Sequence, residues 1–287
     1  MKKKFLGCFL ILVILAAASG ALVYSILHLM TAYQDYEDSR GVYEELEDDF
    51  VERPDTQNEN EADSDEGKYE YLQIDFNGLR AVNPDVIAWI DIPGAGISYP
   101  VLQGEDNSYY LTHLASGEYG ISGSIFVDYN NHPDFSDQNT IIYGHNMKDD
   151  SMFGRLDVYQ DENMYRSEPY FYLYMPGQIY VYRVISAYEG YSNGIAYMFG
   201  FANKVNFLSF EQEILKQSYY DTGTDPSGNE KIVTLSTCTG HGSERRFIVH
   251  GKWVKTVSER LRLQARCRSA GHSRGNERHS FHTDNRL

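Results

Sequence analysis

A long uncharged, apolar run near the N-terminus limits how this chain can fold. It extends from residue 5 to about residue 30 and follows Lys2, Lys3 and Lys4. A helix that spans a bilayer needs about 20 such residues. The lysines before the run and the acidic residues after it place the N-terminus inside the cell and the rest of the chain outside. We therefore predict an N-terminal membrane anchor over residues 1–30.

A cleaved signal peptide is the alternative for the same segment. Small residues at 16–21 would suit a cleavage site. The apolar run continues beyond them, however, whereas the apolar part of a signal peptide usually has only about 7–15 residues. The uncleaved anchor is favoured, and the bulk of the chain is exported under either hypothesis.

Acidic residues dominate the chain and are concentrated after the apolar run. Asp and Glu outnumber Lys and Arg by 41 to 25, for a formal net charge of −16. Such a chain is not expected to bind nucleic acid, because a phosphate backbone requires a basic surface. Residues 31–68 are especially acidic, and like charges at this density resist collapse. They predict an extracellular stalk, in which residues 33–50 could be helical.

The C-terminal segment has the opposite charge. Residues 255–287 contain eight basic and three acidic residues and almost no apolar periodicity after Leu263. We interpret this segment as a basic, disordered tail, with contact to an anionic envelope as the alternative.

Residues 69–254 have the composition of a globular domain rich in β structure. Runs of β-branched and aromatic residues, each closed by turn residues, predict strands. These runs are residues 86–92, 97–102, 124–128, 140–143, 170–175, 178–186, 231–237 and 246–254. Residues 74–79 and 205–219 predict helices. Many short strands with few helices indicate a barrel or a sandwich.

The cysteines point to one reactive thiol. Cys8, Cys238 and Cys267 are too few for a disulfide framework or a four-cysteine zinc site, and Cys8 lies inside the anchor. Cys238 ends a predicted strand and precedes a polar, glycine-containing loop. A buried, inert cysteine is the alternative, but the polar loop and the exported location favour a nucleophile.

A nucleophilic cysteine needs a basic or cationic neighbour and a donor for the developing oxyanion. The candidate bases are His113, His132, His145, His241 and His250. His145 is the best placed, because it follows a glycine at the end of a predicted strand. Arg245 and Arg246 begin the last strand, and a hairpin would bring that start close to Cys238. Alternation sends the two arginines to opposite faces, so one of them is expected to face the thiol.

Several segments resemble one enzyme family. Thr234-Leu235-Ser236-Thr237-Cys238 resembles the TLXTC motif of sortases, the cell-wall transpeptidases of Gram-positive bacteria, and Arg246 resembles the arginine of the following strand. Residues 142–146 and 152–156 resemble the segment that holds the catalytic histidine. Residues 107–111, residues 122–128 and the predicted helix at 205–219 resemble class B members. The resemblance covers roughly residues 70–254.

The resemblance implies a mainly β fold: a closed eight-stranded barrel with additional helices at the N-terminus and before the cysteine strand. It implies His145, Cys238 and Arg246 as the catalytic set. The Cys238 thiolate would attack the threonine carbonyl of an LPXTG- or NPQTN-like sorting signal. A peptidoglycan amine would then take over the acyl group and leave a surface protein on the cell wall. Ser236, Asn107 and Leu111, with Tyr197 from the loop before the helix, would bind the peptide.

Other classes of protein remain as alternatives. Papain-like and cell-wall cysteine peptidases generally place cysteine before histidine in the chain, whereas His145 precedes Cys238. An L,D-transpeptidase would carry an SHGC-like stretch, which is absent from the sequence. A non-enzymatic surface-binding module on an acidic stalk would be indifferent to loss of Cys238. No residue cluster in the sequence calls for a metal or another cofactor, so none is expected. The basic tail with Cys267 departs from the family pattern.

Overall fold

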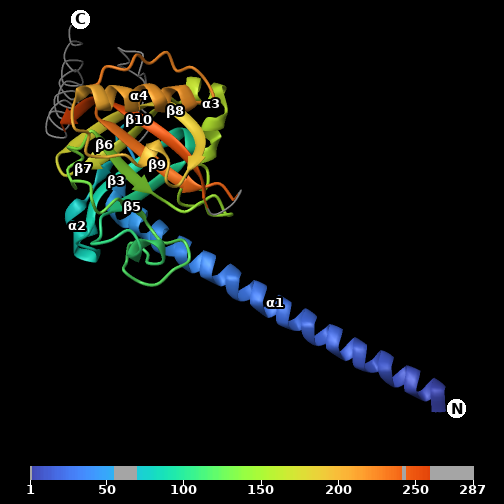
Figure 1. The fold of residues 1–287 in the computed structure, drawn as a ribbon. Coiled ribbons are helices and arrows are strands. Elements are labelled where there is room, and N and C mark those ends of the chain that lie inside the picture. The colour runs from blue at the N-terminus through green and yellow to red at the C-terminus, as the bar shows by residue number, and fades with distance from the viewer. Residues whose placement is uncertain (1, 55–69, 241–243, 259–287) are drawn as a thin grey trace, which may run out of the picture.

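The computed structural model describes residues 2–54, 70–240 and 244–258 (Figure 1). The predicted basic tail beyond Ser258, Cys267, His241 and the last part of the predicted stalk lie outside the described residues, as does the side chain of Cys8.

The described chain contains ten strands. They are β1 (Val51–Glu52), β2 (Gln73–Ile74), β3 (Val86–Ile92), β4 (Ile97–Leu102), β5 (Ile125–Val127), β6 (Asn139–Tyr143), β7 (Tyr170–Met175), β8 (Gln178–Tyr191), β9 (Ile232–Cys238) and β10 (Arg245–Ser258). The α-helices are α1 (Lys2–Phe50), α2 (Phe76–Val82), α3 (Glu162–Ser167) and α4 (Lys204–Gln217), and the short 3₁₀ turns are η1 (Pro93–Ala95), η2 (Tyr109–Leu111), η3 (Leu156–Gln160) and η4 (Ile195–Tyr197).

Eight of these strands close into a barrel. Their order around it is β10-β8-β7-β3-β4-β5-β6-β9, and β1 pairs with β2 in a separate two-stranded sheet. Large apolar side chains such as Trp89, Phe126 and Phe171 fill the barrel and are at most 1% exposed. Closure leaves no unpaired sheet edge. The expected closed, mainly β barrel with additional helices is confirmed.

Two strand pairs are parallel within this otherwise antiparallel barrel: β4 with β5, and β6 with β9. A parallel pair requires a long crossover, and the chain from Gly144 to Lys231 supplies it between β6 and β9. Their parallel pairing brings the C-terminal ends of both strands to the same rim of the barrel.

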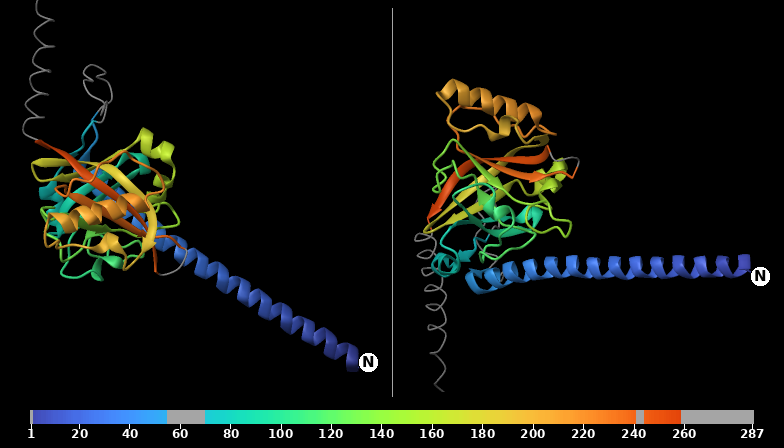
Figure 2. Two further views of the ribbon diagram at one scale, coloured as in Figure 1. Left: turned by 45° about the horizontal axis from the view of Figure 1, so that its top comes forward. Right: turned by 60° about the horizontal axis from the view of Figure 1, so that its bottom comes forward.

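The helix predicted at residues 205–219 is α4, and it covers the outside of the barrel (Figure 2). Its apolar residues Phe207, Phe210 and Ile214 pack with Ile185 and Ile248 in a second core. Asn203 begins the helix, because its side chain accepts a hydrogen bond from the amide of Asn206. This packing fixes the loop just before α4, which contains η4.

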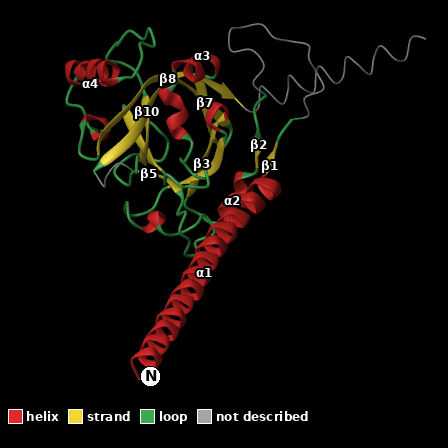
Figure 3. Cartoon of the chain, turned by 90° about the vertical axis from the view of Figure 1, so that its right-hand side faces the viewer, coloured by secondary structure: helices red, strands yellow, loops and turns green. Residues whose placement is uncertain are grey.

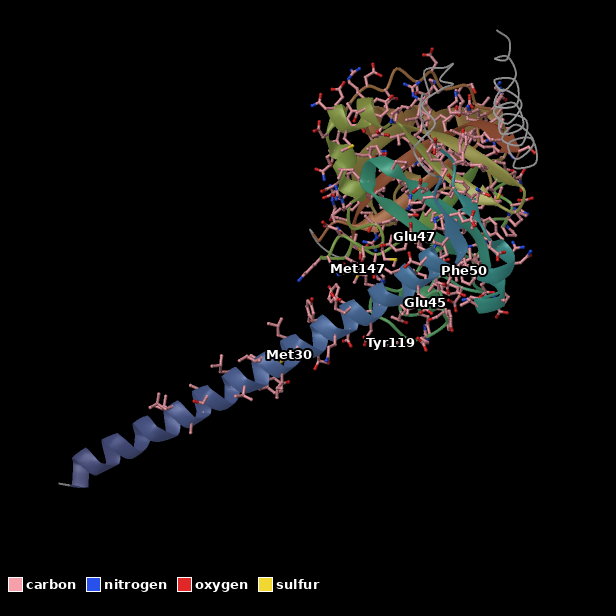
Figure 4. All side chains as sticks on the ribbon, turned by 180° about the vertical axis from the view of Figure 1, so that it is seen from behind. Met30, Glu45, Glu47, Phe50, Tyr119 and Met147 are labelled. Atoms are coloured by element: carbon pink, nitrogen blue, oxygen red, sulfur yellow. The ribbon has the colours of Figure 1, made fainter. Side chains whose placement is uncertain are left out.

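Helix α1 combines the predicted anchor and part of the predicted stalk in one continuous element (Figures 1 and 3). Apolar side chains from Ile14 to Met30 are exposed along it, and this is the described helix long and apolar enough to cross a membrane. Figure 4 shows Met30 on the part of α1 that projects from the barrel, and Phe50 where the helix meets it.

The last turns of α1 differ from the expected solvated stalk. Tyr43 and Leu46 are only 5% and 6% exposed and belong to the main core. They pack because apolar side chains recur every three or four residues on one face of this otherwise acidic helix. Strand β10 also continues beyond the predicted strand end at residue 254, because it pairs with β8 as far as Ser258.

Candidate active site

The site lies at the rim where β6 and β9 end side by side. Tyr143 pairs with Ser236 in register, and the amide of Gly144 donates to the carbonyl of Ser236 at 3.2 Å. His145 lies two residues after Tyr143, and Cys238 lies two residues after Ser236. Gly144 also packs against the ring of Phe153, because a Cβ at this position would lie 2.7 Å from the ring. The parallel pairing therefore brings the predicted base and the predicted nucleophile to the same end of the barrel.

Arg246 is the arginine that shares a face with the thiol. It lies directly opposite Cys238 in the antiparallel pair of β9 and β10, and directly opposite side chains project from the same face of a sheet. Arg245 projects from the other face, where it forms an ion pair with Glu189 at 3.3 Å and lies over the ring of Tyr191. Of the two arginines, Arg246 is therefore the one on the same face as the Cys238 side chain.

Hydrogen bonds hold His145 and the strand end in place. The Nε2 atom of His145 lies 2.7 Å from the carbonyl oxygen of Leu111. A carbonyl only accepts, so Nε2 carries a hydrogen and donates it. The carbonyl of His145 accepts from the amide of Phe153 at 2.9 Å. The next residue, Asn146, donates from Nδ2 to the carbonyl of Cys238 at 2.6 Å.

One pocket of about 240 Å³ contains the predicted site residues. It is lined by Asn107, Leu111, Phe126, Tyr143, Gly144, His145, Ser192, Tyr197, Ser236, Cys238 and Arg246. All seven site residues expected from the sequence are among them. Phe126, Tyr143, Gly144 and Ser192 were not predicted. Adjacency to His145 could have indicated two of these, whereas Ser192 follows β8 with no signal in the sequence.

Hydrogen-bonded tyrosines form one wall of this pocket. The hydroxyls of Tyr197 and Ser236 lie 2.7 Å apart, and the rings of Tyr143 and Tyr197 stack with an interplanar angle of 7°. The Tyr143 hydroxyl and the side-chain amide of Asn107 both donate to Asp128 Oδ2, at 2.9 and 2.8 Å. Contacts therefore connect this wall from Asn107, just before η2, to Ser236 in β9.

Both of these tyrosines remain neutral at physiological pH. Burial raises the pKa of Tyr143 far above its ordinary value, and the charge of Asp128 acts in the same direction. Burial also raises the pKa of Tyr197, although its hydrogen bond to Ser236 and the charge of Arg246 oppose this. The wall thus presents neutral hydroxyls rather than phenolates to the pocket.

The other described candidate histidines are engaged elsewhere. His113 stacks on Tyr109 with ring centroids 3.9 Å apart, and His132 lies 2.9 Å from Asp137. His250 is fully buried behind the site, and burial lowers its pKa to about 3. Among the candidates that the structure describes, His145 is the histidine that lines the pocket with Cys238.

Comparison with known proteins gives consistent matches. A family model described as the sortase domain matches residues 90–254. Sortase B of Listeria monocytogenes is 37% identical over 185 residues, which cover 64% of this chain and 75% of the relative. Sortase B of Staphylococcus aureus is 31% identical over 188 residues, which cover 65% and 77% of the two chains.

Solved structures agree with the sequence matches. The crystal structure of sortase B from Bacillus anthracis in complex with AAEK1 superposes with a TM-score of 0.65 at 32% identity. This similarity covers 78% of the present chain and 99% of that one. A Staphylococcus aureus sortase B–substrate complex superposes with a TM-score of 0.59 at 30% identity, over 63% and 84% of the two chains.

A closed barrel of this topology with these relatives defines a cysteine transpeptidase. The chain belongs to the sortase family, in its class B. Enzymes of this family are associated with the cell surface and act on surface proteins that carry sorting signals, and the expected class of enzyme is confirmed.

Proposed function

We propose that this transpeptidase joins surface proteins to an amine of the peptidoglycan precursor through a thioacyl intermediate on Cys238. The observation that carries the proposal is the convergence of Cys238, His145 and Arg246 in one pocket at the barrel rim. Cys238 is exposed at its strand end, where a peptide can reach it.

The roles follow from where each group lies. The Cys238 thiolate attacks the threonine carbonyl of an LPXTG- or NPQTN-like signal. Arg246, on the same face as Cys238, stabilises the oxyanion that forms. His145 protonates the departing amine as the peptide bond breaks, which leaves a thioester. The acceptor amine then attacks the thioester, His145 receives its proton, and a new amide forms as the thiolate of Cys238 is released.

The remaining pocket residues are proposed to bind the peptide. Leu111 and Phe126 supply apolar surface, while Ser236, Tyr197 and Asn107 supply polar groups. Because the Tyr197 and Ser236 hydroxyls are already bonded to each other, they form a defined polar patch that loses little rotational freedom when a peptide binds.

The first part of α1 is proposed to anchor the enzyme in the cell membrane. Its apolar side chains are exposed between Ile14 and Met30 and would be covered by lipid. Three lysines precede the apolar segment, so the barrel would lie outside, facing the cell wall.

The test is an assay of the full-length chain in detergent micelles with fluorogenic NPQTN-, LPXTG- and SPKTG-type peptides. We expect one peptide type to yield an acyl adduct on Cys238 by intact mass, which an added amine acceptor removes faster. Cys238→Ala is the matched control and should show neither adduct nor cleavage.

Two outcomes would contradict the proposal. Cleavage that no amine accelerates, over a series of acceptors, would indicate a hydrolase. A folded chain with a free thiol that forms no adduct with any of the three peptide types would favour a binding module instead.

A further inference from the structure

The last turns of α1 contact the segment that holds the proposed catalytic histidine. A cavity of about 560 Å³ lies between α1 and the barrel, and its lining includes Arg40 and Tyr43 from the helix and Asp149 and Met152 from the loop after His145. The helix therefore contacts the loop that follows His145.

Tyr43 is the buried contact in this interface. Its hydroxyl donates to the carbonyl of Gly123 at 2.5 Å and accepts from the amide of Ala115 at 3.2 Å. It also lies 3.0 Å from the hydroxyl of Ser124. Its ring meets Tyr99 edge to face, with centroids 5.3 Å apart. One side chain of α1 thus binds three points of the segment between η2 and β5.

That segment carries the hydrogen-bond acceptor of His145. Gly123 packs directly on η2, since a Cβ at this position would lie 2.7 Å from the carbonyl oxygen of Leu111. Its φ of +53° also suits glycine. The same Leu111 oxygen accepts from His145 Nε2 at 2.7 Å. A continuous path of contacts therefore runs from Tyr43 through Gly123 and Leu111 to the imidazole.

A second contact from α1 reaches the loop that follows the histidine. Arg40 forms an ion pair with Asp149 at 3.2 Å. The other carboxylate oxygen of Asp149 accepts from the Ser151 hydroxyl at 2.7 Å, and Met152 forms a β-bridge with Asn146. This pair is partly exposed and contributes little stability alone, so Tyr43 is the stronger of the two contacts.

We propose that Tyr43 of α1 is a positioning residue for His145, acting through Gly123 and the Leu111 carbonyl. The inference rests on the acid–base role proposed for His145. The end of the N-terminal helix then contributes to the active site, because it sets the position of the Leu111 carbonyl, which orients the His145 imidazole.

The experiment compares Tyr43→Phe with Tyr220→Phe in the full-length chain. Phenylalanine keeps the ring of Tyr43 and its contact with Tyr99 and removes only the hydroxyl. Tyr220 is the matched control, because it is also buried and its hydroxyl donates to the carbonyl of Tyr159 at 2.9 Å. Neither Tyr43 nor Tyr220 lines the active-site pocket that contains Cys238. Both variants should fold, and Tyr43→Phe should lose more stability, because the Tyr43 hydroxyl has three polar contacts and that of Tyr220 has one.

Two readouts separate positioning from a general loss of structure. The first is the ring ¹⁵N resonance of His145, assigned by its disappearance in His145→Gln. We expect it to shift in Tyr43→Phe and to stay unchanged in Tyr220→Phe. The second is the acylation rate: kcat should fall about 5- to 50-fold in Tyr43→Phe with little change in KM, because a misplaced acid loses part of its contribution.

The outcomes keep this inference distinct from the proposed function. An unchanged His145 resonance, or an equal fall of kcat in both variants, would overturn the positioning role of Tyr43 even in an active transpeptidase. A wild-type chain that forms no thioester would overturn the proposed function, whereas the resonance comparison would still report whether Tyr43 orients His145.

Discussion

Arg246 and Cys238 are direct cross-strand neighbours at the end of the sheet where β9 stops and β10 begins. The pairing leaves Arg245 on the other face, bound to Glu189. Two adjacent arginines in the sequence therefore have different surroundings. This relationship gives the proposed oxyanion donor a position fixed by backbone pairing rather than by a flexible loop.

Replacement of each arginine by lysine in turn tests this assignment. Arg246→Lys should lower kcat/KM by a factor of about 10²–10³, because lysine cannot reproduce the planar, forked guanidinium. Arg245→Lys is the matched control and should change kcat/KM less than about threefold, since its ion pair is a surface contact. Peptide cleavage by both variants measures this difference, and equal effects would remove Arg246 from the mechanism.

Loss of the nucleophile and loss of the general acid should lower acylation to different extents. Cys238→Ala should abolish both adduct and product. His145→Ala should lower acylation by about 10²–10⁴-fold, the usual contribution of a general acid. His113→Ala serves as the control because His113 lies outside the pocket lining. Intact mass after timed quenching measures the adduct, and rapid acylation by His145→Ala would contradict the role of His145.

The hydroxyl pair of Tyr197 and Ser236 should behave as one unit. Tyr197→Phe and Ser236→Ala should each reduce kcat/KM by about fivefold, in keeping with the loss of one hydrogen bond of about 1 kcal/mol. The double variant should be no worse than either single one, because both remove the same 2.7 Å contact. Additive losses in this double-mutant cycle would show that the two side chains act on the peptide independently.

The buried His250 should make the enzyme sensitive to acid. Its pKa falls from 6.5 to about 3 on folding because burial disfavours the charged ring. The unfolded chain therefore binds the proton more readily, and stability decreases as the pH falls from about 6.5 towards 3. The slope from this group is about 1.4 kcal/mol per pH unit.

Urea unfolding followed by tryptophan fluorescence at several pH values measures this slope. His250→Gln should remove it, which leaves the acid response of the carboxylates. His132→Gln is the contrasting control: the hydrogen bond that the His132 ring donates to Asp137 raises the pKa of His132, so this variant should lose stability below about pH 6.5 rather than gain acid resistance. Identical pH dependence in wild type and His250→Gln would contradict the argument.

The docked end of α1 can be tested through stability. Leu46→Ala should reduce the free energy of unfolding by about 2–4 kcal/mol, because Leu46 is 6% exposed and its truncation leaves a cavity. Glu45→Ala, at the exposed neighbouring position, should change it by less than about 0.5 kcal/mol. A neutral Leu46→Ala would mean that this part of α1 is only a tether.

Local patterns were sufficient to predict the barrel strands and the strand ends that carry Cys238 and His145. Both Cys238 and His145 follow apolar, β-branched runs, and such runs identify strand ends well. Their proximity could not be derived in the same way, because the parallel pairing of β6 and β9 depends on a crossover of more than 80 residues. The family resemblance, rather than periodicity, connected the two residues.

The sequence was misleading in the last turns of α1, where acidic residues surround a row of apolar side chains. Tyr36, Tyr43, Leu46 and Phe50 follow helical spacing in α1, but acidic residues surround them and favoured the interpretation as a solvated stalk. Similarly, β8 extends to Tyr191, five residues beyond the predicted strand end at 186, because β10 pairs with its whole length. In both cases contacts with distant segments decided the outcome.

The continuity of α1 has a consequence for how the enzyme meets its substrates. A flexible stalk would let the barrel sweep a volume, but a helix rises about 1.5 Å per residue and resists bending. With the proposed anchor ending near Met30 and burial beginning at Ser39, the barrel would be held about 14 Å from the lipid. The catalytic pocket would then keep a set height above the bilayer. A sorting signal would have to come to that height above the membrane to reach Cys238.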